Sequence, residues 1–352
     1  MVRRDLLRFL ADAINPYSWI MMIRNLAFDT GVLKSHKPDI PTICVGNITV
    51  GGTGKTPHIE YISGILKEKY TIAVLSRGYG RKSKGYIKAM GTTSMEQIGD
   101  EPFQIKQKFP GIDVAVCEKR AEGIERLKEG DRALQVVLLD DAFQHRHIKA
   151  GLNILLIDSS RPVWRDCVMP FGRLRERAHG IARADIVIFT KCKGLTAEQK
   201  SAYRSYIKER KEIPVYFTAI RYGKSYPLFG NTAATIAAGS RVLLVTGIAN
   251  PQPLKAEIEK RGAKVELMQY GDHHDFSTTD LEDIATCFAK SGCTMIVTTE
   301  KDAARLGQRN DLPQTVRDNT HVLPIEVEFL DGEDKLFNKI IYDYVTEDSR
   351  DS

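Results

Sequence analysis

Beyond residue 40, apolar residues gather into short β-branched runs that alternate with stretches of helical periodicity. This alternation is typical of βαβ units around a mostly parallel sheet. The strands it predicts first are Thr42–Val45, Ile72–Leu75, Asp113–Cys117, Gln135–Leu139, Asn153–Ile157, Asp185–Phe189 and Val215–Ala219. Residues 41–225 are therefore expected to form a doubly wound α/β domain.

A change in the pattern after residue 225 predicts a second, smaller α/β domain. Residues 226–240 are rich in small and turn-forming residues and carry no charge, which is typical of a connection between domains. In residues 241–312 we expect strands at Arg241–Thr246, Lys264–Met268 and Thr294–Thr299. Residues 313–352 should add a strand at His321–Ile325, a helix at Lys335–Tyr344 and a frayed acidic tail from Glu347.

The first 40 residues are interpreted as an amphipathic helical segment. Apolar side chains recur there at helical spacing, and a contiguous apolar run follows; they are Leu6, Leu10, Ile14, Tyr17 and residues 19–23. No stretch reaches the roughly 20 apolar residues that a membrane span needs. Asp5 and Asp12 also interrupt any signal-peptide core. Two interpretations remain, a helix packed on the body of the protein and an anchor lying on a membrane surface.

Composition and charge narrow the partner classes only slightly. The chain has 352 residues, 42% hydrophobic and 27% charged, which indicates a folded protein rather than a disordered one. The formal net charge of +6 is compatible with nucleic acid, anionic lipid or a phosphorylated substrate. Six cysteines without a C-x-x-C pair argue against a zinc knuckle or a disulfide framework and favour a reducing cytosol.

The positive excess is concentrated in two places. Residues 1–37 hold six Lys or Arg against three Asp, and residues 77–88 hold five bases and no acid. A run such as Arg77, Arg81 and Lys82 is ordinarily a solvated loop. The sharper hypothesis is that it meets a substrate phosphate or anionic lipid headgroups.

The strongest chemical signal is a glycine-rich loop between the first strand and a helix. Backbone N–H groups of such a loop close around phosphate oxygens, and the helix N-terminus adds a favourable dipole. Lys55 is expected to reach the β and γ phosphates and Thr56 to ligate magnesium. The strict pattern has glycine where Thr49 stands. The predicted ATP-binding residues are Thr49, Val50, Gly51, Gly52, Thr53, Gly54, Lys55 and Thr56.

Two carboxylates, Asp140 and Asp141, directly follow the predicted strand Gln135–Leu139. At the carboxyl end of a buried strand they can cap the next helix, or hold a magnesium ion beside the loop. The guanine-binding N-K-x-D pattern does not occur, so ATP with Mg²⁺ is the expected nucleotide pair. Val50 also differs from the signature lysine of partition-type ATPases.

Several further motifs occur together along the chain. They are Ser76-Arg77-Gly78-Tyr79-Gly80-Arg81, Gly99-Asp100-Glu101-Pro102, Asp140-Asp141-Ala142-Phe143-Gln144-His145, Arg173-Leu174-Arg175-Glu176, Asp272-His273-His274 and Thr299-Glu300-Lys301-Asp302-Ala303. With the glycine-rich loop and the N-terminal segment, this set closely resembles the tetraacyldisaccharide 4'-kinases of lipid A biosynthesis, over nearly the whole chain. Ala142 and Met169 are small departures, where glycine and leucine are usual.

The resemblance implies phosphoryl transfer from ATP to the 4'-hydroxyl of a tetraacylated glucosamine disaccharide 1-phosphate, with lipid IVA as the product. It also implies a peripheral location on the cytoplasmic face of the bacterial inner membrane, bound through the N-terminal segment. Neither a nucleic acid nor a required protein partner is expected.

The resemblance also assigns site residues. Asp100 is expected to be the general base, assisted by His273. Asp140 and Asp141 are the expected metal-site residues, and Gln144 an active-site contact. The catalytic cleft is also expected to contain Arg175 and Glu176, whose roles the resemblance does not separate. Without the resemblance, Asp100 reads as a helix N-cap and His273 as a solvated turn residue, and capping can coexist with catalysis.

Two rival functions are weighed against the kinase. The first is a nucleotide-switched ATPase of the partition or metal-insertion type that acts on a protein partner, which the residue at position 50 disfavours. The second is a nucleic-acid-binding ATPase, suggested by the sequence pI near 8.8. The chain shows no basic stripe interleaved with aromatic residues and no known nucleic-acid module.

Overall fold

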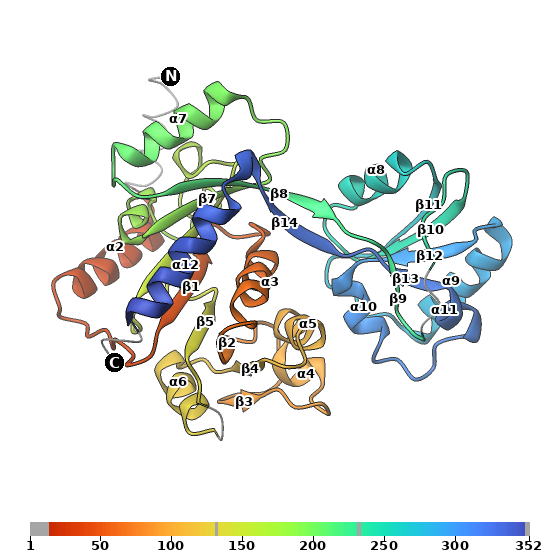
Figure 1. Cartoon of the computed structure of the whole chain (residues 1–352), viewed down its shortest axis with the longest axis horizontal. Helices are drawn as coiled ribbons and strands as arrows, with labels where there is room; N and C mark the ends of the chain where they lie inside the picture. The colour runs from red at the N-terminus through yellow and green to blue at the C-terminus, as the bar shows by residue number, and fades with distance from the viewer. Residues whose placement is uncertain (1–13, 131–132, 231–233, 349–352) are drawn as a thin grey trace.

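The computed structural model describes residues 14–130, 133–230 and 234–348. These residues form two α/β domains joined by a pair of long strands (Figure 1). The large domain contains the first part of the chain and its C-terminal helix, and the small domain is built from residues between them.

The large domain is built on a nine-stranded sheet. Its strands, from one edge to the other, are β14 (Ile325–Phe329), β8 (Val215–Tyr222), β7 (Ile186–Thr190), β6 (Leu152–Asp158), β1 (Thr42–Asn47), β5 (Val136–Asp140), β2 (Ile72–Ser76), β4 (Asp113–Val116) and β3 (Ile87–Lys88). Only the two edge strands pair antiparallel. The predicted doubly wound, mostly parallel sheet is therefore confirmed.

Both faces of this sheet are buried, which explains why its strands read as continuous apolar runs. Neighbouring residues of β1 point to opposite cores, Ile43 to one and Cys44 to the other. The first core is covered by α3 (Lys55–Leu66), α5 (Asp100–Lys108) and α12 (Asp334–Asp348), and the second by α6 (Arg120–Lys128) and α7 (Ala197–Lys208). The short helix α4 (Met95–Ile98) precedes α5.

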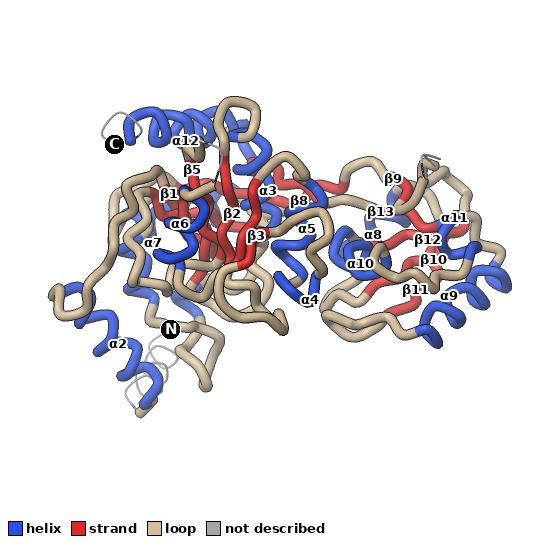
Figure 2. The backbone as a smooth tube through the Cα atoms, turned by 90° about the horizontal axis from the view of Figure 1, so that it is seen from below, coloured by secondary structure: helices blue, strands red, loops and turns tan. Residues whose placement is uncertain are grey.

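The small domain has its own five-stranded sheet between helices. The strands are β11 (Lys264–Gln269), β10 (Arg241–Thr246), β12 (Met295–Thr298), β13 (Thr320–Val322) and β9 (Tyr226–Pro227). Helix α8 (Gln252–Lys260) packs in one core, and α9 (Thr278–Ser291) and α11 (Gln314–Asn319) in the other. Helix α10 (Glu300–Leu306) follows β12 and faces α5 of the large domain (Figure 2).

The chain crosses between the domains twice, and this corrects the expected C-terminal segment. Strand β8 leaves the large domain, and β14 returns beside it in antiparallel register, from Tyr222 opposite Ile325 to Thr218 opposite Phe329. The single strand expected at 321–325 is thus two strands in different sheets, β13 and β14. Because Pro324, between them, has no N–H to donate, it is a natural place for the ladder to change partners.

Two smaller expectations also differ from the structure. The expected linker begins with a strand, because Tyr226–Pro227 forms β9 on the edge of the small sheet. The expected tail from Glu347 is helical as far as Asp348, inside α12. Residues 231–233 of the linker and 349–352 of the tail lie outside the described residues.

Helix α2 (Pro16–Asp29) is the described part of the N-terminal segment. Its N-cap Asn15 accepts a hydrogen bond from the Ser18 amide and donates its side-chain amide to the Val168 and Met169 carbonyls at 3.2 and 2.8 Å. The helix is thereby fixed to the large domain at its N-terminal end. The outer face of the helix remains largely apolar and exposed, at Trp19, Ile20, Met22, Ile23 and Leu26, and Ile14 just before the helix is exposed as well.

The other part of the expected amphipathic segment, with Leu6 and Leu10, lies outside the described residues. Among residues 14–130, 133–230 and 234–348, no helix has both the length and the apolarity to cross a bilayer.

Candidate active site

The glycine-rich loop lies between β1 and α3, as expected. Gly51 and Gly54 adopt positive φ angles of 99° and 86°, which L side chains rarely adopt, and Gly54 is the N-cap of α3. Asn47 at the end of β1 donates its side-chain amide to the Thr53 hydroxyl at 2.6 Å. The loop is therefore held in shape by its own backbone and by β1, at the N-terminus of α3, and such a helix end favours the binding of a phosphate group.

The segment that carries Arg175 is hydrogen-bonded to the start of this loop. The Val50 amide donates to the Arg173 carbonyl and the Arg175 amide to the Ile48 carbonyl, both at 2.8 Å. This backbone pairing brings the Arg175 side chain to Asp141, with its Nη1 2.9 and 3.0 Å from the two carboxylate oxygens. Lys55 Nζ lies 3.7 Å from the same carboxylate. Two cations and one acid thus meet at the mouth of the loop.

The paired aspartates end β5 beside the loop, where the sequence placed them. Asp140 is 1% exposed, its Oδ2 accepts a hydrogen bond from Ser76, and its Oδ1 is buried without a hydrogen-bond partner among the residues that the structure describes. Burial, and then the charges of Glu101 and Asp141, raise the pKa of Asp140 well above its usual range. A bound Mg²⁺ would satisfy the orphaned oxygen and the excess negative charge, so these residues fit that ion.

Glu176 and Gln144 lie behind Arg175, on its interior side. The structure therefore distinguishes the positions of Arg175 and Glu176, which the sequence did not. The Glu176 carboxylate is almost fully buried and accepts hydrogen bonds from Arg183 at 2.7 Å and from Asn25 of α2 at 2.9 Å. Gln144 donates to it at 3.1 Å and accepts from Arg175 at 3.3 Å. Arg175 therefore reaches the open side of the site, where Gln144 contacts it directly, and Glu176 holds Gln144 from within.

Asp100 and His273 meet across the two domains, 173 residues apart in sequence. Asp100 begins α5 in the large domain, and His273 lies in the β11–α9 loop of the small domain, with its Nδ1 2.8 Å from the Asp100 Oδ2. His273 has a φ of +60°, a sparsely populated conformation for a residue with a side chain. The guanidinium of Arg305 on α10 contacts the same carboxylate oxygen.

The charge state of Asp100 follows from these contacts. Burial by itself would raise the pKa of Asp100, but the hydrogen bond with His273 and the charge of Arg305 outweigh it and hold that pKa below its ordinary value. Asp100 is therefore a carboxylate at neutral pH, able to accept a proton. Both contacts engage Oδ2; the other carboxylate oxygen, Oδ1, makes no hydrogen bond within the described parts of the chain.

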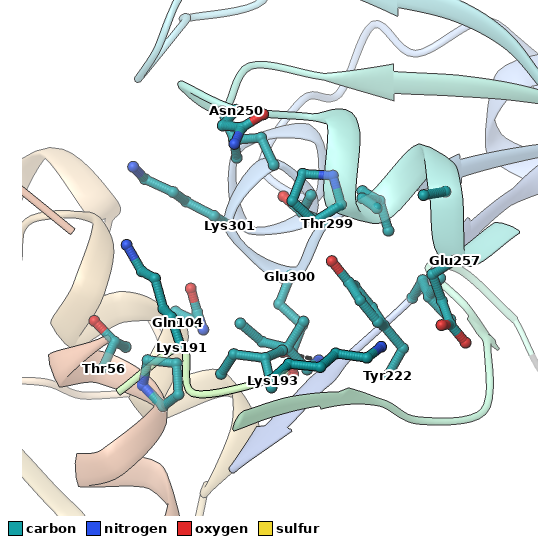
Figure 3. A pocket seen from close by; sticks show the side chains of 18 of the residues that line it. Thr56, Gln104, Lys191, Lys193, Tyr222, Asn250, Glu257, Thr299, Glu300 and Lys301 are labelled. Carbon is teal, nitrogen blue, oxygen red and sulfur yellow. Dashed lines mark hydrogen bonds between the residues drawn. The ribbon is translucent and has the colours of Figure 1, made fainter. Parts of the chain in front are cut away.

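A cavity of about 660 Å³ extends from the glycine-rich loop into the gap between the domains. Thr56 and Gln104 line it from the large domain, and Asn250 and Lys301 from the small domain (Figure 3). Tyr222 of the connecting strand β8 forms part of its wall. The cavity thus begins where phosphates would be held and ends at Lys301, whose ammonium group contacts His273.

The basic residues after β2, namely Arg77, Arg81 and Lys82, are less accessible than the sequence predicts. Arg81, offered as a surface cation, has a side chain only 2% exposed and pairs with Glu118 at 2.5 Å, so it is a structural residue of its loop. Lys82 is exposed but pairs with Glu96 at 2.5 Å. Arg77 is exposed with no ion pair to a described residue, and the pair that Lys82 makes is itself exposed, so the predicted role stays open for these two residues and not for Arg81.

Sequence reasoning missed two cations of α10, Lys301 and Arg305. Lys301 stood inside a quoted motif without a role, and Arg305 follows it by four residues, which places both on one helix face. That spacing predicts that the two cations share a helix face. It does not predict that this face meets α5, because the contact between α10 and α5 depends on the tertiary structure.

A glycine-rich loop at a helix N-terminus, a strand-end pair of aspartates and a carboxylate–imidazole pair between two domains are features of the class of P-loop phosphotransferases. Comparison with known proteins agrees. The family described as tetraacyldisaccharide-1-P 4'-kinase (LpxK) matches residues 6–345, and the chain belongs to this family.

Individual relatives support the assignment over nearly their full length. A tetraacyldisaccharide 4'-kinase of Phocaeicola vulgatus is 46% identical over 350 residues, with 96% of each chain covered. One of Flavobacterium psychrophilum is 42% identical, with 96% of this chain and 98% of the relative covered. A crystal structure of "apo" form LpxK from Aquifex aeolicus in complex with ATP matches with a TM-score of 0.75 and 29% identity, covering 98% of this chain and 100% of that one.

Proposed function

We propose that this chain transfers the γ-phosphate of ATP to the 4'-hydroxyl of a tetraacylated glucosamine disaccharide 1-phosphate, forming lipid IVA. Family membership and the names of the relatives support the kinase activity. The observation that carries the mechanism is the Asp100–His273 contact between the domains, since Lys301, which lines the cavity, contacts His273, and the proton acceptor Asp100 therefore lies close to that cavity.

ATP binds with its phosphates on the loop and its nucleoside in the interdomain cavity. Lys55 and the N-terminal amides of α3 hold the β and γ phosphates. Thr56, Asp140 and Asp141 would hold Mg²⁺, which supplies charge neutralisation on the transferred phosphoryl group and the leaving diphosphate. Arg175, 26% exposed above Asp141, adds a cation on the same side. The relative from Aquifex aeolicus, whose structure contains ATP, supports the nucleotide assignment.

Asp100 acts as the general base. The 4'-oxygen forms a bond to the γ-phosphorus as the bond from that phosphorus to the β–γ bridging oxygen breaks, so ADP leaves with the electron pair. The hydroxyl proton passes to the Asp100 carboxylate, most directly to Oδ1, because Oδ2 is occupied by His273 and Arg305. His273 orients the carboxylate and stabilises its charge.

The protein binds peripherally to the cytoplasmic face of the inner membrane through α2. The exposed apolar face of that helix supports this, and so does the attachment of α2 to the site through Asn25 and Glu176. We assign Arg77 to the 1-phosphate or to anionic headgroups, and its exposure supports this role. This arrangement would let the enzyme act on a lipid that stays in the bilayer, with no protein partner required.

The test is incubation with radiolabelled ATP and a panel of acylated disaccharide phosphates, followed by separation of the lipids. We expect label in a tetraacylated product, and loss of that label in Lys55→Met. ATP hydrolysis without a labelled lipid would instead favour a nucleotide-switch ATPase acting on a protein partner. Label on disaccharides irrespective of acylation would refute a lipid substrate.

A further inference from the structure

Two cations of α10, in the small domain, contact the proposed base Asp100 and its partner His273. Lys301 Nζ lies 3.0 Å from His273 Nε2, on the opposite side of the imidazole ring from Asp100. Arg305, one turn later on the helix, contacts Asp100. Lys301 is also seen in Figure 3 extending from α10 toward the interdomain cavity. Neither residue is needed to bind phosphate in the mechanism above.

The contact with Lys301 determines where the proton of His273 resides. An ammonium group has three donors and no acceptor, so Nε2 must offer a lone pair to accept its hydrogen bond. The Asp100 carboxylate can only accept a hydrogen bond, so Nδ1 of His273 must carry a hydrogen and donate it to Asp100. Both neighbours therefore demand the same form of the ring, the neutral tautomer protonated at Nδ1.

Other protonation forms would oppose a donor to a donor or an acceptor to an acceptor. The Nε2-protonated tautomer would direct an N–H at Lys301 and leave two acceptors facing each other at Asp100. The imidazolium would also direct an N–H at Lys301. Arg305 lies 3.2 Å from Nδ1, but with the Nδ1 hydrogen committed to Asp100 this is close packing rather than a second hydrogen bond.

Arg305 is fixed by a rigid part of the small domain. Its side chain is 4% exposed, and its Nη1 is 3.4 Å from Asp302, which is completely buried. Asp302 in turn accepts hydrogen bonds from Thr246 and Thr299, both at 2.7 Å. The end of β10 and the N-cap of α10 thus hold Arg305 against Asp100 when the domains are in contact.

We propose that Lys301 and Arg305 are positioning residues of the catalytic base, an inference that rests on the proposed function. Lys301 selects the Nδ1–H tautomer of His273, and Arg305 occupies the Oδ2 atom of Asp100. Together they leave Oδ1 as the acceptor for the substrate hydroxyl. Because both cations belong to the small domain, the base is assembled only when α10 lies against α5.

The tautomer is tested by nitrogen NMR on full-length protein labelled at its histidine ring nitrogens, with His273 assigned from the His273→Asn difference. The wild-type ring should show a protonated Nδ1 and an unprotonated Nε2. In Lys301→Met we expect other protonation forms to appear, and Lys301→Arg should restore the wild-type pattern because it keeps a donor. Lys290→Met, an exposed charge loss on α9, should leave the pattern unchanged.

Turnover gives the second readout. At saturating ATP, kcat of Lys301→Met should fall roughly 10–100-fold, the size of effect found for groups that orient the ligands of a metal site, with recovery in Lys301→Arg. A fall in kcat without a change in the His273 spectrum would overturn the proposal, and so would a changed spectrum with normal kcat. If the wild-type protein phosphorylated no lipid, the proposed function would fail, while the spectrum would still report whether Lys301 selects the tautomer.

Discussion

The exposed apolar face of α2 predicts a measurable loss of membrane affinity when it is made polar. Ile20 and Ile23 lie three residues apart on this helix, so they share a face, and each is 63% exposed. The perturbation is the double substitution Ile20→Ser and Ile23→Ser. Because neither side chain belongs to the described core, the fold of the large domain should be retained.

The magnitude follows from the exposed area. Complete burial of an isoleucine side chain is worth about 1.5–3 kcal/mol. With 63% of each side chain available to enter a membrane, each contributes about 1–2 kcal/mol and the pair about 2–4 kcal/mol. At about 1.4 kcal/mol for each factor of ten, the partition constant should fall roughly 30- to 700-fold.

The assay is co-sedimentation with vesicles that contain anionic phospholipid, over a range of lipid concentrations. Leu336→Ser is the matched control, because Leu336 is 61% exposed on α12, which lies away from α2 (Figure 2). It should leave the partition constant unchanged. Equal binding of the wild type and the double variant would refute the surface-anchor role of α2, as would an equal loss in the control.

The other predictions concern the base and the domain contact. Asp100→Asn keeps the side-chain shape but removes the proton acceptor, so kcat should fall roughly 10²–10⁴-fold with ATP binding retained, and near-normal single-turnover rates would exclude Asp100 as the base. In Arg305→Met the pKa of Asp100 should rise, since the charge of Arg305 no longer helps His273 to offset burial, and the acid limb of the kcat/KM profile should move to higher pH; an unmoved limb would contradict this. Lys108 Nζ bridges the buried carboxylates of Glu60 and Glu300, at 2.6 and 2.8 Å, so Lys108→Met should cost roughly 3–5 kcal/mol of unfolding free energy. An unchanged denaturant midpoint would show that the two acids do not need this partner.

Much of the candidate site was predictable because its signals are local. The glycine-rich loop and the aspartates at the end of β5 lie at strand ends, and the carboxyl ends of parallel strands meet at one edge of a sheet. Asp100 and His273 could be paired only through the family resemblance, since no spacing rule links residues that far apart. Arg81 was predicted to be a surface cation because its run of bases contains no acid. In the structure its side chain is buried and pairs with Glu118, which comes from a distant segment.

The sequence by itself determined the alternation of strands and helices, the phosphate-binding loop and the family, because each is written in contiguous residues or ordered motifs. Only the tertiary structure decided that β13 and β14 join different sheets. It also decided that Lys301 and Arg305 contact His273 and Asp100. The physical reason is that strand pairing and interdomain contact depend on which distant surfaces meet. Hydrophobic periodicity reports which face of an element is buried, not which partner covers it.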